Sequence, residues 1–311
     1  MLRLMLTAHP DLCVPPESMF FVQLADRYEA GLSSDEDVRS FLDTLYENQK
    51  FSEWGVDRPA LRTRLTEAVY CSYAEAVSTV YETYQETQDP TAIRWGDKNP
   101  DYVYQIPAIF THFPEARVIH LVRDVRAVYN SYRSKAVLEN WSQLDPNRLI
   151  QSVTQQWRQC GRVRRTYGED PRVTHVFYED LVAQPRPALQ ALCRDVGLSF
   201  SEDMIRFYRK NEDEHLVPSH RREWHKKTFQ PVDEGRATAW KRELSRSEIE
   251  ALEVLNQADM HDFGYQTVTT APRPRGQFLI FRKRVSAAVY RSARRASSLL
   301  RRIKSSISAA S

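Results

Sequence analysis

The stretch that decides the fold is residues 117–135, RVIHLVRDVRAVYNSYRSK, where an apolar run stops at Arg-Asp and a helical pattern follows. The aliphatic residues of 118–122 predict a strand buried on both faces. Ala127 and Tyr132 then recur at helical spacing. A tight turn from a strand into a helix leaves free N–H groups and the positive end of the helix dipole beyond the strand.

Arg123 stands at this turn and has two interpretations. Its guanidinium is a planar fork of donors suited to phosphate, and Ser131, two helical turns later, can reach the same side. The stretch is therefore a candidate anion site. The alternative, equally compatible with this stretch alone, is that Arg123 and Asp124 form a structural ion pair capping an ordinary helix.

The rest of the chain predicts an α/β fold. Residues 92–95 and 173–181 have the composition of strands. Helical patterns cover residues 2–8, 61–84, 102–110 and about 187–196. Such alternation predicts a parallel sheet flanked by helices, in which ligands bind beyond the carboxyl ends of the strands.

Three further residues lie at predicted strand ends or in the adjoining loops, and each has an ordinary explanation. Lys98 fits a solvated loop cation. Tyr178 fits a strand residue stacked on the core. Glu17, within Pro15-Pro16-Glu17-Ser18, fits a cap of the next helix, because these residue types are typical of turns.

Length and composition indicate a globular protein of 311 residues. The net charge of +3 hides an asymmetry, because every charged residue after Asp262 is basic and the preceding part is net acidic. The four cysteines are dispersed without metal-ligand spacing; they are Cys13, Cys71, Cys160 and Cys193. We find no secretory signal and no apolar run of membrane-spanning length, which favours a cytoplasmic protein.

Five motifs, in order along the chain, together resemble one known family. They are AHPDLCVPPES (8–18), WGDKNP (95–100), the 117–135 stretch, VFYEDL (176–181) and PVDEGRATAWKREL (231–244). The set is similar to sulfotransferases that use 3′-phosphoadenosine 5′-phosphosulfate (PAPS), in particular the bacterial type related to tyrosylprotein sulfotransferases. Five collinear motifs are more specific than any one alone. The resemblance implies a P-loop-NTPase-like parallel sheet flanked by helices, and no metal.

The resemblance assigns chemistry to two residues. Glu17 matches the base that removes the proton of the acceptor hydroxyl. Lys98 matches the lysine that stabilises charge on the transferring sulfuryl group and its leaving oxygen. One base and positioned cations are what an in-line transfer requires.

The resemblance assigns donor binding to four more residues. Arg123 and Ser131 match the pair that binds the 3′-phosphate of PAPS. Lys135 occupies a further basic position on the same helix, and Tyr178 matches a tyrosine that contacts the bound nucleotide.

The chain departs from the family pattern in two places. In the family, the helix matching residues 2–8 follows a strand and a loop resembling Pro-Arg-Ser-Gly-Thr-Thr, which cradles the 5′-phosphosulfate, and both are missing here. A late start assignment, a truncation or a non-catalytic remnant would explain this, and the retained Glu17 and Lys98 favour the first. We expect little or no transfer by the chain as written and activity in a form extended upstream. Ala239 replaces a common basic residue, for which Arg236 is the candidate substitute.

The chain divides into a sulfotransferase domain (1–270) and a basic tail (271–311). Residues 277–307 place apolar and arginine side chains on opposite sides of a helix, which predicts attachment to an anionic membrane surface. A disordered basic tail and nucleic-acid binding are the alternatives, and the acidic body argues against nucleic acid.

These observations predict sulfuryl transfer from PAPS to a hydroxyl acceptor such as a carbohydrate or glycolipid, by a cytoplasmic protein held peripherally at the membrane. The alternative is a non-catalytic PAPS-binding or PAP-binding pseudoenzyme, PAP being 3′-phosphoadenosine 5′-phosphate, or a membrane-associated adaptor. A kinase is a weaker option, since no Gly-rich Lys-Ser/Thr loop can be placed.

Overall fold

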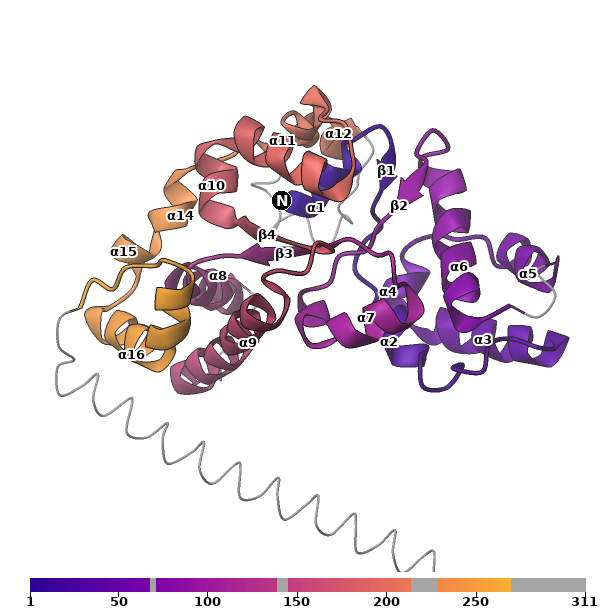
Figure 1. Cartoon of the computed structure of the whole chain (residues 1–311), viewed down its shortest axis with the longest axis horizontal. Helices are drawn as coiled ribbons and strands as arrows, with labels where there is room; N and C mark the ends of the chain where they lie inside the picture. The colour runs from indigo at the N-terminus through magenta and orange to yellow at the C-terminus, as the bar shows by residue number, and fades with distance from the viewer. Residues whose placement is uncertain (68–70, 139–144, 214–228, 270–311) are drawn as a thin grey trace, which may run out of the picture. The chain divides into compact units, whose positions relative to one another are not determined.

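The computed structural model describes residues 1–67, 71–138, 145–213 and 229–269 (Figure 1). The chain forms two compact units. The first comprises residues 1–122 and 166–234, and the second comprises residues 123–165 together with the chain from Gly235 onward.

One half of the first unit is a helical cluster with an aromatic core. Its helices are α2 (Phe20–Leu24), α3 (Asp35–Glu47), α4 (Gln49–Ser52), α5 (Arg58–Glu67) and α6 (Tyr73–Gln88). The buried rings of Phe20, Phe51, Trp54 and Tyr81 contact one another with centroids 5.1–5.8 Å apart. Such ring pairs stabilise the core beyond the area that they bury.

The prediction of one helix over residues 61–84 is wrong, because the structure has two helices there. Helix α5 ends at Glu67, and α6 begins at Tyr73 with a capping box between Ser72 and Glu75. The residues between include an antiparallel bridge from Cys71 to Leu32. The apolar spacing continues across the break, so it cannot reveal the cap that starts a new helix.

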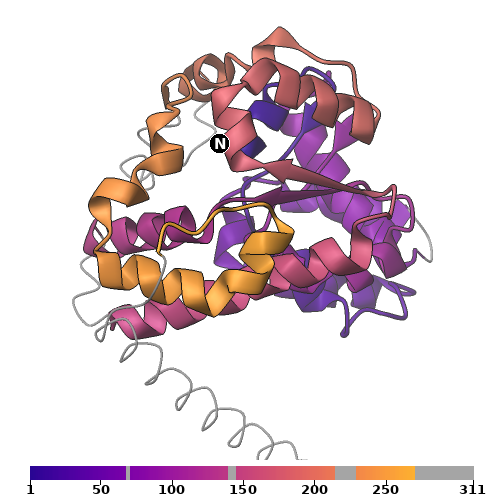
Figure 2. The ribbon, with the colours of Figure 1, turned by 60° about the vertical axis from the view of Figure 1, so that its left-hand side comes forward.

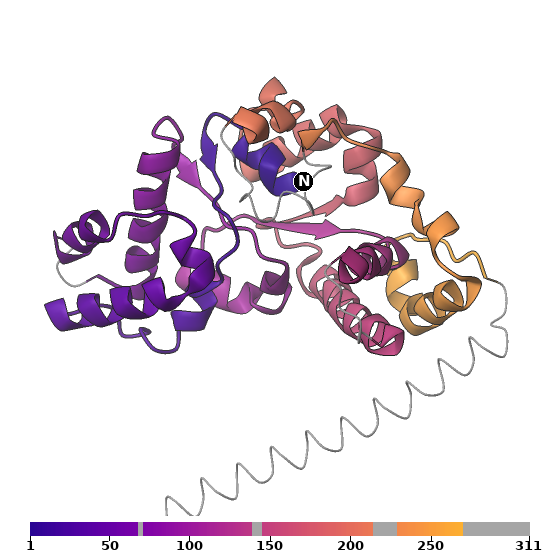
Figure 3. The same ribbon diagram turned by 180° about the vertical axis from the view of Figure 1, so that it is seen from behind.

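Four short strands form two parallel pairs instead of the single predicted sheet. Strand β1 (Leu12–Cys13) pairs with β2 (Arg94–Trp95), and β3 (Val118–Val122) pairs with β4 (Val173–Phe177). No strand joins β2 to β3 within the described residues (Figure 3). The α/β class and the parallel direction are confirmed. Apolar pattern identifies a strand but does not say which strands become neighbours.

Strand β3 is less buried than its composition predicts. His120 and Val122 are buried, whereas Leu121 between them is 39% exposed. The strand therefore buries the face of His120 and Val122 at its carboxyl end, and its other residues are partly or largely exposed. Its neighbour β4 also ends earlier than predicted, because Tyr178 is the first residue of helix α10 (Tyr178–Ala183) and not a strand residue.

The other half of the first unit packs helices around the N-terminal helix α1 (Leu2–Thr7). Helix α1 packs against η2 (Glu202–Met204) and α12 (Phe207–Asp213) and lies near α11 (Pro185–Val196) (Figure 1). Leu4, Met5, Leu189 and Leu192 lie in the shared core. The first unit also contains η1 (Pro100–Tyr104) and α7 (Ile106–His112).

The second unit is a group of helices (Figure 2). They are α8 (Val125–Leu138), most of α9 (Pro146–Tyr167), α14 (Gly235–Thr238), α15 (Trp240–Glu243) and α16 (Arg246–Asp262). Helix α8 packs against α14, α15 and α16. Asn256 on α16 donates to Thr154 on α9 at 3.2 Å, so α16 is tied to α9 as well.

None of the helices in the described residues combines the length and apolar character that crossing a membrane requires. The tail helix predicted for residues 277–307 lies outside the described residues.

Candidate active site

The loop that carries Glu17 follows β1 and is held at both ends. The Val14 carbonyl accepts hydrogen bonds from Arg3 at 3.1 Å and from Thr7 at 3.2 Å, both on α1. The Ser18 carbonyl accepts one from Asn48 at 3.1 Å. These contacts, together with two consecutive prolines, fix where the Glu17 side chain projects.

Glu17 and Lys98 form a direct ion pair across 81 positions of sequence. The geometry follows from the sheet, because β1 and β2 are parallel neighbours and the loops after them leave the same edge. The side chain of Glu17 is 30% exposed and that of Lys98 is 43% exposed. The pair is therefore reachable from solvent, and Lys98 is not merely a solvated loop cation.

Burial alone would raise the pKa of Glu17, but the charge and hydrogen bond of Lys98 hold it below its ordinary value, and Lys50 and Arg3 lower it further. Glu17 does not cap helix α2, because the residue at that cap is Met19, which makes no side-chain cap bond. Met19 has a φ of 63°, a left-handed conformation that is uncommon for a residue with a side chain. The turn after Glu17 is thus strained, as is common beside functional groups.

The backbone at Lys98 is anchored by a buried carboxylate. Asp97 accepts hydrogen bonds from the Lys98 N–H at 2.7 Å, from the Tyr81 hydroxyl at 2.6 Å and from the Tyr102 hydroxyl. Burial raises the pKa of Asp97, although these hydrogen bonds lower it. The Tyr81 ring stacks on Trp95 with centroids 4.3 Å apart, which fixes this network to β2.

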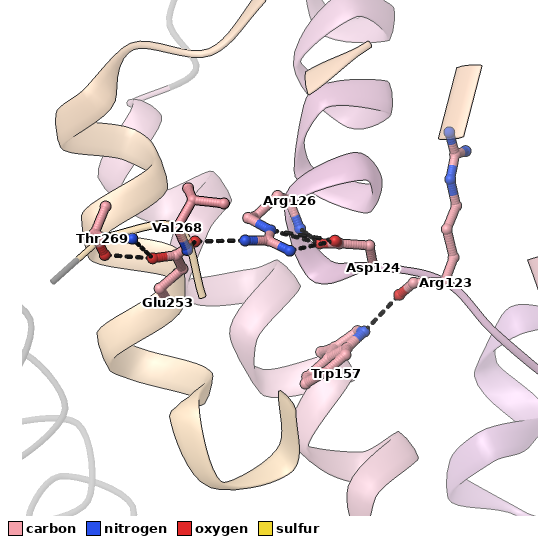
Figure 4. A network of polar contacts seen from close by, with 7 residues as sticks. All are labelled: Arg123, Asp124, Arg126, Trp157, Glu253, Val268 and Thr269. Atoms are coloured by element: carbon pink, nitrogen blue, oxygen red, sulfur yellow. Dashed lines mark hydrogen bonds and ion pairs between the residues drawn. The ribbon is translucent and has the colours of Figure 1, made fainter. Parts of the chain in front are cut away.

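Arg123 directly follows β3 and begins the second unit. In that unit its guanidinium donates to the Arg236 carbonyl at 3.0 Å. Its own carbonyl accepts a hydrogen bond from the Trp157 indole at 2.8 Å (Figure 4). The ion pair at this turn joins Asp124 to Arg126 at 2.6 Å. Asp124 also accepts the N–H of Arg126 at 2.8 Å, so the predicted cap exists, but Arg126 supplies the cation.

A buried network holds this turn against α16 (Figure 4). Arg126 pairs with Glu253 as well as Asp124, and its guanidinium lies 3.9 Å from the centre of the Trp240 ring. Glu253 also accepts the N–H groups of Val268 at 3.0 Å and Thr269 at 3.1 Å, and the Thr269 hydroxyl. Burial would lower the pKa of Arg126, but the two carboxylates raise it above its ordinary value.

The remaining predicted residues occupy distinct positions. Ser131 is exposed on α8, and Lys135 is half-buried one turn later on the same side. Tyr178 is buried at the start of α10 in the first unit, and Phe177 before it is paired in register with Val122. The structure thus brings Glu17 to Lys98. Arg123 lies just before α8, and Ser131 and Lys135 lie on that helix.

Ala239 lies immediately before α15, and Arg236 is half-buried on α14, where its carbonyl meets Arg123. The sequence interpretation missed the supporting residues Arg3, Asp97 and Arg126. Asp97 lies within the motif WGDKNP and Arg126 within the 117–135 stretch, so their closeness in sequence to Lys98 and Arg123 was the available signal.

No cluster of three or more His, Cys, Asp or Glu side chains that could hold a metal occurs in the described part of the chain.

Comparisons with known proteins agree with this architecture. Two solved structures are similar in fold: the sulfotransferase domain from the curacin biosynthetic pathway and that from the Synechococcus PCC 7002 olefin synthase. The first has a TM-score of 0.56 and 20% identity, covering 85% of this chain and 93% of its own. The second has a TM-score of 0.54 and 22% identity, covering 85% and 90%.

A search of curated proteins gives no match. The comparison with protein families matches residues 1–202, more than half of the chain, to the sulfotransferase family. The chain belongs to the sulfotransferase family.

Proposed function

We propose that this protein transfers a sulfuryl group from PAPS to a hydroxyl group of an acceptor. The observation that carries the proposal is the Glu17–Lys98 pair, a solvent-reachable base and cation brought together from distant parts of the sequence. Family membership supports sulfuryl transfer as the reaction class.

Glu17 is the proposed base. Its lowered pKa keeps the carboxylate ionised at neutral pH, ready to accept the proton of the acceptor hydroxyl. The acceptor oxygen then forms a bond to sulfur while the bond from sulfur to the 5′-phosphate oxygen breaks, and PAP leaves with that electron pair. The atoms balance without a further reactant.

Lys98 is the proposed cation for the leaving oxygen. In the structure the Lys98 ammonium group is paired with the Glu17 carboxylate. During turnover Lys98 must therefore leave Glu17 and contact the sulfuryl oxygens instead. Loss of the Lys98 contact would raise the pKa of Glu17, because that contact lowers it. The exchange therefore makes Glu17 a stronger base at the step that needs one.

For donor binding we propose Arg123, Ser131, Lys135 and Tyr178, in a P-loop-NTPase-like arrangement. Arg123 lies two residues before α8, a 14-residue helix whose first N–H groups and dipole favour an anion. The exposed hydroxyl of Ser131 fits a 3′-phosphate ligand. We add Arg236 as a candidate second cation, since its backbone contacts the Arg123 guanidinium.

We further propose that the acceptor is a carbohydrate or glycolipid and that residues 277–307 attach a cytoplasmic protein to anionic membrane. Their charge pattern is the support for this proposal. Flotation with anionic vesicles should be strong for the full chain and lost for residues 1–272. Equal flotation of the two forms would contradict attachment through the tail.

Ligand-induced thermal stabilisation tests donor binding. PAP should raise the melting temperature of the chain, since a ligand of the native state stabilises it. Arg123→Ala should abolish the shift, whereas Arg39→Ala, which removes an exposed arginine on α3, should retain it. Absence of a shift in the unmodified protein would contradict the proposal.

Transfer of label from ³⁵S-PAPS distinguishes the enzyme from the alternative. Incorporation of label into a hydroxyl acceptor supports the enzyme. PAP binding with no transfer to any acceptor, either by the chain as written or by a form extended upstream, supports the non-catalytic nucleotide-binding alternative.

A further inference from the structure

Arg3 contacts the loop of the proposed base from beneath. It lies on the first turn of α1 and donates from Nη1 to the Val14 carbonyl at 3.1 Å. The Thr7 hydroxyl, one turn later on the same face, donates to the same carbonyl at 3.2 Å and to the Arg3 carbonyl at 2.9 Å. Val14 is 3% exposed and Thr7 is 5% exposed, so the accepting carbonyl is shielded from water, whereas Arg3 itself is half-buried.

An arginine is a costly choice for this hydrogen bond. Removing a charged guanidinium from water is unfavourable, whereas a neutral donor satisfies a carbonyl at much smaller cost. Thr7 already is such a donor. A role for the positive charge itself would explain why an arginine stands here.

The positive charge of Arg3 acts on the Glu17 carboxylate, three residues beyond Val14. Glu17 is attracted by Lys98, which follows β2, by Lys50 on α4 and by Arg3 on α1. Lys50 is exposed, whereas Lys98 and Arg3 are half-buried, and of the three cations Arg3 alone also donates to the backbone of the loop that carries Glu17 among the contacts described. Tyr84 on α6 and Cys13 on β1 also face Arg3.

We propose that Arg3 is a positioning residue for Glu17: its hydrogen bond fixes the 14–17 loop, and its positive charge orients the carboxylate. The inference rests on the proposed role of Glu17 as base. It matters most when Lys98 leaves Glu17 for the sulfuryl group, because Arg3 and Lys50 are then the cations that still attract the carboxylate.

The direction of the pKa values agrees with this role. Burial lowers the pKa of Arg3, and the nearby Glu17 carboxylate opposes that effect. The Arg3 charge in turn lowers the pKa of Glu17. Each group thus favours the charged form of the other.

The test titrates Glu17 directly, by ¹³C NMR of the full chain labelled at glutamate carboxyl carbons, with the signal assigned through Glu17→Gln. Arg3→Gln keeps a donor for Val14 but removes the charge, and should move the Glu17 titration to higher pH. Arg3→Lys keeps the charge and should leave the titration near that of the unmodified protein. Thr7→Val removes the neutral donor and should not shift it.

Two outcomes would overturn the inference. One is a Glu17 titration unchanged in Arg3→Gln. The other is an equal shift in Arg3→Gln and Arg3→Lys, which would indicate a merely structural hydrogen bond. Should Arg3→Gln not fold, the same comparison is made between Arg3→Met and Arg3→Lys.

The readout does not require turnover, so it separates this inference from the proposed function. A charge-dependent titration with no PAP binding would contradict the proposed function and leave the Arg3–Glu17 coupling standing. In active protein, the acid limb of the kcat/KM pH profile should move upward in Arg3→Gln by the same amount as the NMR titration.

Discussion

Replacing Arg126 by methionine should strongly destabilise the second unit at neutral pH. The side chains of Arg126, Asp124 and Glu253 are only 4%, 7% and 2% exposed. Methionine fills a similar volume but leaves two buried carboxylates without their shared cation. Removing one partner of a buried ion pair costs about 3–5 kcal/mol, which is a large part of a typical unfolding free energy of about 5–15 kcal/mol.

The cost should depend on pH in a defined direction. Without Arg126, two carboxylates lie in the interior without their shared cation, which is unfavourable while they are charged. Acid reduces this cost because it neutralises carboxylates. The difference between the unmodified protein and Arg126→Met should therefore be smaller at about pH 5 than at about pH 8.

Urea unfolding followed by tryptophan fluorescence measures the difference, because Trp157 and Trp240 both lie in this unit. Arg162→Met is the matched control: Arg162 is an exposed arginine on α9 that bonds only to Gln159 among the contacts described, and its replacement should cost less than about 0.5 kcal/mol. A loss below about 1 kcal/mol for Arg126→Met at about pH 8, or a loss that does not shrink with acid, would refute the reasoning.

Three further predictions concern the candidate site. Glu17→Gln should abolish sulfate transfer but leave the PAP-induced rise in melting temperature intact; retained transfer would exclude Glu17 as the base. Tyr102→Phe removes a donor to Asp97 and should cost about 1–3 kcal/mol in urea unfolding, against a smaller cost for Tyr104→Phe, because Tyr104 is 41% exposed. Ser131→Ala should weaken PAP binding about 10-fold or more in calorimetry, as expected for a lost hydrogen bond to a charged group, and leave binding of adenosine 5′-phosphosulfate unchanged.

The sequence predicts individual elements better than their assembly. Strand β3 has the bounds 118–122 that its aliphatic run predicts, and α11 covers the predicted helix at 187–196. Both signals are local, since burial of a face sets the period. The division into two strand pairs depends on contacts between distant segments, which no local pattern encodes.

The candidate site shows the same division. The motifs drew attention to Glu17 and Lys98, and β1–β2 pairing explains why they meet. The residues that hold the site in place are harder to predict. Tyr81 on α6 bonds to Asp97 in the loop after β2, and Glu253 bonds to Arg126 across 127 positions. A carboxylate's buried partner is chosen by packing, so only the folded chain identifies it.

Glu253 also has a mechanical consequence. By holding the backbone of Val268 and Thr269, it gives the C-terminal segment a fixed point of departure beside the first turn of α8. A pull on the chain beyond Thr269 would load Glu253 first and reach Arg126 next. A force applied at Thr269 is thereby transmitted to the turn that carries Asp124 and Arg126.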